Sequence, residues 1–225
     1  MLFRSLDTAV SIHMGNKDSA AAKAVVKAFV ETGDPEKRLD RARAAAGVLA
    51  RHGLSGDAAD LFAGVLGSLD GAAADDLELL GKLLLGASRP DRAKAALDAA
   101  FEKSGATVET ALRIADLWAR SQQPRRAAAV LQRVKNASAS QAVDLALRAG
   151  RHLRDAGDAE AEDAWYREAA SRAADAGALW QAVGESLTRA GEVARALAAF
   201  EAAEAAAPDA RRVAFAQVGR AEAML

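Results

Sequence analysis

Residues 177–210 read GALWQAVGESLTRAGEVARALAAFEAAEAAAPDA, and this stretch decides the fold. Its first half places Trp180, Val183, Gly184 and Leu187 at steps of three and four residues. Residues at this spacing share one face of an α-helix. Gly184 lies within that face, where the absence of a side chain lets a second helix approach closely. The first half therefore predicts a helix that packs tightly against a neighbour.

The second half of the same stretch predicts that neighbour. Gly191 follows the apolar residues of the first helix and is typical of a helix end. Ala196, Phe200 and Ala203 then form the inner stripe of a second helix. Pro208 cannot continue a helix, so the unit ends before it. Residues 177–210 are thus one helix–turn–helix unit.

Copies of this unit precede it along the chain. Landmarks of several kinds are separated by 34 positions: Gly150 and Gly184, Gly157 and Gly191, Tyr166 and Phe200, Ala93 and Ala127, Leu97 and Leu131, Pro90 and Pro124, Gly47 and Gly81. Between Ala115 and Gly150 the step is 35, which indicates one inserted residue in a turn near residues 136–141. Such a period is the signature of a repeat protein.

The unit resembles the tetratricopeptide repeat, whose pattern is W-x2-L-G-x2-Y…A-x3-F…P. Val183 and Leu187 stand where that family usually has Leu and Tyr, and the other positions match. The resemblance implies an all-α fold, a right-handed superhelical solenoid of stacked antiparallel helix pairs. It also implies a protein–protein interaction module, a scaffold or adaptor that holds a partner segment in its concave groove.

The period predicts the organisation of the chain. We expect five repeats, over residues 40–73, 74–107, 108–142, 143–176 and 177–210. Residues 1–39 should form N-terminal helices, one interpretation of which is a degenerate repeat, with Asp18 or Ser19 capping the second of them. Residues 211–225 should form a C-terminal capping helix that begins after Asp209, with Val213, Phe215 and Val218 as its contacts.

Composition excludes several classes of function. The chain has no cysteine, so it has no disulfide framework or thiolate metal site. Its net charge of −1 favours neither nucleic acid nor an anionic membrane as a partner. No apolar run approaches the roughly 20 residues that span a bilayer. The N-terminal stretch is a poor signal peptide, so we expect a cytoplasmic protein.

No catalytic constellation is present. The three histidines, His13, His52 and His152, lie far apart and in different units, and none forms an i, i+4 metal pair. The glycines lack the spacing of a phosphate-binding loop. We therefore expect no enzyme, and no catalytic, cofactor-binding or metal-binding residue.

The expected binding surface is the row of first helices, which line the inner side of such a solenoid. Helical spacing places seven candidate peptide-binding residues there: Lys82, Asp116, Arg120, Arg151, Arg154, Glu185 and Arg189. Arginine presents a planar fork to carboxylates, so an acidic or mixed-charge peptide of another protein is the expected partner. The alternative is a solvated face whose arginines pair with Asp116, Asp144 and Asp155.

The resemblance does not extend to one known binding mode of this family. The carboxylate clamp of this family uses groove-facing asparagines, and the only asparagines here, Asn16 and Asn136, lie elsewhere, so recognition of a free C-terminus is not expected. The chain could also be a regulatory or accessory domain of a larger enzyme, sensor or secretion/assembly protein.

Trp118 and Trp180 fall on packing positions, whereas Trp165 is adjacent to Tyr166. One of these two neighbours should be partly exposed or pack on the next unit.

Overall fold

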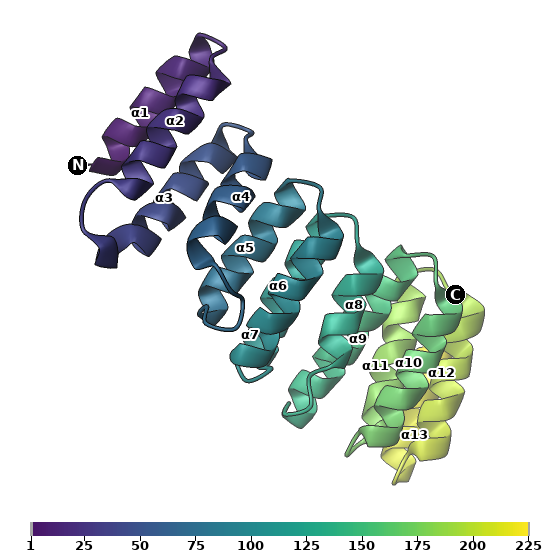
Figure 1. Cartoon of the computed structure of the whole chain (residues 1–225). Coiled ribbons are helices and arrows are strands. Elements are labelled where there is room, and N and C mark those ends of the chain that lie inside the picture. Colours follow the sequence, from purple (N-terminus) through teal and green to yellow (C-terminus); the bar gives the residue numbers. More distant parts are fainter. Residues whose placement is uncertain (1, 225) are drawn as a thin grey trace. The chain divides into compact units, whose positions relative to one another are not determined.

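The computed structural model describes residues 2–224, and the side chains of residues 5–224. Every regular element in this part of the chain is helical, as the sequence predicts (Figure 1). The elements are α1 (Leu2–Gly15), α2 (Ser19–Glu31), the single 3₁₀ turn η1 (Pro35–Lys37), α3 (Arg38–Arg51), α4 (Ser55–Leu66), α5 (Ala74–Gly86), α6 (Pro90–Lys103), α7 (Val108–Arg120), α8 (Pro124–Gln132), α9 (Ala139–Asp155), α10 (Ala159–Arg172), α11 (Ala176–Arg189), α12 (Val193–Ala206) and α13 (Ala210–Glu222).

The chain divides between Gly105 and Ala106 into two compact units. In the first unit α1 packs on α2, α3 on α4, and α5 on α6. In the second unit α7 packs on α8, α9 on α10, and α11 on α12, with α13 against α11 and α12. Within each unit the second helix of one pair also packs on the first helix of the next. The fold is therefore the all-α stack of helix pairs that the 34-residue period predicts.

Local sequence signals set the helix ends. The Asp18 carboxylate accepts a hydrogen bond from the Ala21 amide at 2.9 Å, and the Asp209 carboxylate accepts one from the Arg212 amide at 2.9 Å. Such side chains satisfy amides that have no partner within the helix. At the turn after α11, Gly191 has a φ of 78°, a conformation that side chains disfavour. These signals are short-range, which is why the sequence predicted them.

Glycines on first helices receive the bulky side chains of second helices. A Cβ built on Gly184 would lie 2.6 Å from the Phe200 ring, and Gly150 and Gly81 face Tyr166 and Leu97 in the same way. Gly184 is thus a packing residue, as predicted. A fourth glycine differs, because a Cβ on Gly47 would meet nothing within 4 Å outside its own helix.

This contrast predicts opposite effects of one substitution. Gly184→Ala should lower the free energy of unfolding by about 1–3 kcal/mol, because the new methyl group overpacks the buried Phe200 ring. Gly47→Ala should raise it by about 0.5–1 kcal/mol, because alanine is the better helix former and the space is open. Urea unfolding followed by circular dichroism measures both. Equal effects of the two substitutions would contradict this packing.

The contacts of α13 differ from those predicted. A Cβ on Gly219 would lie 2.5 Å from the Phe200 ring, so α13 turns this glycine toward α12. Ala216 and Gly219 are consequently buried, whereas Phe215 and Val218, predicted as contacts, are each 55% exposed. The prediction was wrong for Phe215 and Val218, because the space beside Phe200 accepts only a glycine, whereas Val213, the third predicted contact, is half-buried.

Candidate peptide-binding groove

Two of the predicted binding residues line one hollow in the second unit. It has a volume of about 160 Å³ and lies between α7, α8 and α9. Its lining residues are Leu112, Ala115, Asp116, Ala119, Leu131, Arg148, Arg151 and His152. Asp116 comes from the first helix of one pair and Arg151 from the first helix of the next. We call this hollow the α7–α9 groove.

Charges at the α7–α9 groove are only partly paired. Arg120 forms an ion pair with Asp116 at 2.8 Å, and Arg148 forms one with Asp144 at 2.8 Å, both one helical turn apart. These pairs follow the alternative of a solvated face. Arg151 is exposed and forms no ion pair within the described part of the chain. It is the cation of this groove that remains available to a ligand.

His152, which lines the α7–α9 groove, carries an unsatisfied polar atom. Its Nδ1 is buried and has no hydrogen-bond partner among the described protein atoms. Burial lowers the pKa of His152, with Arg151 acting in the same direction and Asp155 opposing it. The ring is therefore neutral at pH 7, with one nitrogen able to donate and the other able to accept a hydrogen bond.

The remaining predicted residues lie elsewhere. Glu185 accepts a hydrogen bond from the Gln181 side chain at 3.0 Å, and lines a separate hollow of about 400 Å³ between α11, α12 and α13. The Arg189 guanidinium donates to the backbone oxygen of Glu185 at 3.2 Å. Lys82 is exposed on α5 in the first unit. The α7–α9 groove therefore does not include these three residues.

Arg154, predicted on the groove surface, instead belongs to a buried ionic cluster. Its guanidinium lies 2.7 Å from the carboxylate of Glu162, which is fully buried. The Arg195 guanidinium of α12 lies 2.8 Å from the other Glu162 oxygen, and 2.5 Å from Asp163. The Tyr166 hydroxyl donates to Glu162 at 3.0 Å. With its charge paired internally, Arg154 is not a free cation for a peptide.

One signal in the sequence could have found this cluster. Glu162 stands 34 positions before Ala196, at the position where the other units have a buried alanine: Ala59, Ala93 and Ala127. A carboxylate at a buried small-residue position requires cationic partners, because an unpaired buried charge is costly. The 34-residue period therefore places Glu162 at a buried position, where an arginine from a nearby helix is the expected ion-pair partner.

The aromatic residues mostly serve the core. Trp118 is buried, and the Arg126 guanidinium lies 5.0 Å from its ring centroid. Trp165 and Tyr166 are both buried. The Trp165 indole N–H donates a hydrogen bond to the backbone oxygen of Ala146 on α9 at 3.0 Å. This contact lies within the α9–α10 pair, so it does not meet the expectation that one of the two is partly exposed or packs on the next unit. Trp180 is only half-buried and lines a hollow between α10 and α12.

Tyr166 should report the cluster directly, since it is the only tyrosine of the chain. Burial and the neighbouring Glu162 carboxylate raise its pKa well above the ordinary value of about 10. The folded protein thus holds this proton more tightly than the unfolded chain. Stability from this source is fully present below pH 10 and falls as the pH rises further. Absorbance at 295 nm should show tyrosinate only when the protein unfolds. A reversible titration near pH 10 in the folded protein would contradict the cluster.

Among the described residues, no three histidine, aspartate or glutamate side chains lie close enough together to hold a metal ion. Within residues 2–224, no helix combines the length and the apolar character needed to cross a lipid bilayer.

Comparisons with known proteins concern the fold. No protein-family model and no curated protein matches the chain. Among solved structures, it is similar to a tetratricopeptide repeat protein from Parabacteroides merdae ATCC 43184, at 13% identity and a TM-score of 0.31, with 99% of each chain covered. It is also similar to a circular tandem repeat protein with novel repeat topology and enhanced subunit contact surfaces, at 16% identity and a TM-score of 0.19. That match covers 99% of this chain and 44% of the other. The helical repeat described above rests on the chain's own helices.

Proposed function

We propose that this chain is a protein-interaction module that holds an extended segment of a partner in the α7–α9 groove. The observation that supports the proposal is the combination of an unpaired, exposed Arg151 with the His152 ring in the lining of one hollow. A peptide offers the complementary groups: a carboxylate for the guanidinium, and a backbone amide or carbonyl for the ring.

Because the chain is nearly neutral, the electrostatic attraction for a partner segment must come from individual residues of the groove. The whole chain carries a net charge of −1, so a broad electrostatic field does not gather anionic partners. The partner segment is therefore of mixed charge, with an acidic residue opposite Arg151. Asp116 also lines the groove and, although it is paired with Arg120, its negative charge disfavours a strongly acidic segment.

Reversing the charge of Arg151 tests the groove. Peptides are selected from a random displayed library on the full chain, and the enriched sequences are synthesised and titrated by fluorescence anisotropy. Arg151→Glu should weaken their binding at least tenfold, and less so at higher salt, because an exposed ion pair is screened. Arg167→Glu, an exposed arginine on the second helix α10, is the matched control and should leave affinity unchanged.

Arg154 is left intact in this experiment, because its loss would break the buried cluster. If selected peptides contain no enriched acidic position, or if Arg151→Glu leaves their affinity within twofold, the partner does not use the α7–α9 groove.

A further inference from the structure

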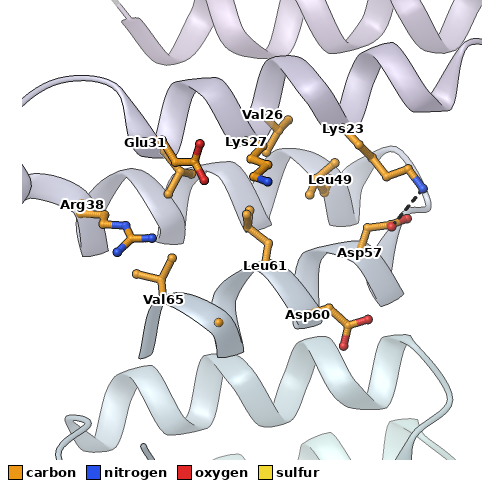
Figure 2. Close-up of a pocket in the computed structure, with 12 residues that line it drawn as sticks. Lys23, Val26, Lys27, Glu31, Arg38, Leu49, Asp57, Asp60, Leu61 and Val65 are labelled. Carbon is orange, nitrogen blue, oxygen red and sulfur yellow. Dashed lines mark ion pairs between the residues drawn. The ribbon is translucent and has the colours of Figure 1, made fainter. Parts of the chain in front are cut away.

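The first unit contains a larger hollow with an apolar floor. It has a volume of about 370 Å³ and lies between α2, α3 and α4 (Figure 2). Its apolar lining residues are Val26, Val30, Leu49, Leu61 and Val65. The volume lies in the range of small-molecule sites, about 300–1,000 Å³. We call this hollow the α2–α4 pocket.

Two acidic residues at its rim are already neutralised. Lys23 on α2 pairs with Asp57 on α4 at 3.1 Å, which closes one end of the pocket (Figure 2). Asp60 accepts a hydrogen bond from the Arg89 guanidinium at 2.6 Å. These carboxylates therefore offer little attraction to a cationic ligand.

Two cations at the rim have no such partner. Lys27 and Arg38 form no ion pair within the described residues, although Glu31 lies one helical turn from Lys27. Figure 2 shows the Lys27 side chain reaching from α2 toward Leu61, and the Arg38 side chain beside Val65. Together with Glu31 they leave a surplus of one positive charge over an apolar floor.

We propose that the α2–α4 pocket binds a medium-chain aliphatic carboxylate. The aliphatic chain covers the floor and loses its contact with water, which is the dominant favourable term. The carboxylate lies between the Lys27 ammonium and the Arg38 guanidinium, whose planar fork donates hydrogen bonds to both carboxylate oxygens. This site lies in the first unit and stands or falls independently of the α7–α9 groove.

Decanoate is the probe, titrated into the full chain below its micellar concentration and followed by amide chemical shifts in NMR. Shifts should appear on α2 and α4 around Val30 and Leu61. The double variant Lys27→Gln/Arg38→Gln should weaken binding at least tenfold. Lys17→Gln removes an exposed lysine of the same unit outside the pocket, and should leave affinity unchanged.

Blocking the floor supplies a second, uncharged test. A Cβ on Gly64 would meet nothing within 4 Å outside its own helix, so Gly64→Leu should fold and occlude the pocket. Decanoate binding should then be lost. The proposal is overturned if Gly64→Leu retains affinity, if decylamine binds as tightly as decanoate, or if decanoate shifts no residue of the pocket.

Discussion

Glu162→Gln should lower the free energy of unfolding by about 3–5 kcal/mol, the cost of removing one partner from a buried ion pair. The amide is nearly the same shape as the carboxylate, so the loss comes from charge. Arg154 and Arg195, whose side chains are 20% and 19% exposed, would lose their shared counter-ion. Urea unfolding followed by tryptophan fluorescence measures the change, since all three tryptophans lie in the second unit.

Two comparisons separate charge from packing in this cluster. Asp163→Asn removes only the half-exposed partner of Arg195 and should cost less than about 1 kcal/mol, as solvent-exposed pairs do. Replacing Arg154, Glu162 and Arg195 together by apolar residues should recover much of the lost stability, because no unpaired buried charge remains and Asp163 is half-exposed. An effect of Glu162→Gln no larger than that of Asp163→Asn would show that the cluster is solvated.

Phe200→Ala should cost a similar amount, about 3–5 kcal/mol, through the cavity it leaves. The Phe200 ring is 1% exposed and lies against two glycines, Gly184 on α11 and Gly219 on α13. Neither glycine has a side chain that could move into the space, so the cavity should close poorly. Amide hydrogen exchange in α13 should accelerate as well, because that helix rests on the ring.

Exposed phenylalanine provides the control. Phe215→Ala, at an exposed position of α13, should change stability by no more than about 0.5 kcal/mol. A double-mutant cycle that combines Phe200→Ala with Gly184→Ala should show coupling between the two substitutions. The methyl group added at Gly184 occupies part of the space that Phe200→Ala opens. Strictly additive effects would contradict the contact between Gly184 and Phe200.

The fold was predictable from sequence because its determinants are local and repeated. The helix ends depend on residues such as Asp18, Asp209 and Gly191, each of which acts within one turn of its own position. The glycine that receives a bulky residue 16 positions later recurs in several units, as with Gly184 and Phe200. A pattern that repeats gives several independent observations of one contact.

Side-chain pairing was harder to predict, because it depends on single residues in separate helices. Arg154 shares the face expected of a groove residue, yet its side chain is paired with Glu162 on α10, which also binds Arg195 on α12. Arg151, three positions earlier, has no such partner and remains exposed. The peptide-binding role of the seven predicted residues stays a prediction.

The α2–α4 pocket left no signal in the sequence. A pattern search detects bulky residues at expected positions, whereas this hollow comes from open space beside small ones such as Gly64. The pairing of the rim charges could not be predicted either. Lys23 is paired and Lys27 is not, because Asp57, which lies on another helix, is positioned beside Lys23.

The Glu162 cluster also restricts how the repeats can be rearranged. Its carboxylate belongs to α10, and Arg195, which neutralises one of its oxygens, lies 33 residues further on in the next helix pair. A copy of the Glu162 pair inserted elsewhere in the array would bring the buried acid without that arginine. Duplication, deletion or exchange at this point must therefore move two helix pairs together. The order of these two repeats is therefore restricted by their charges.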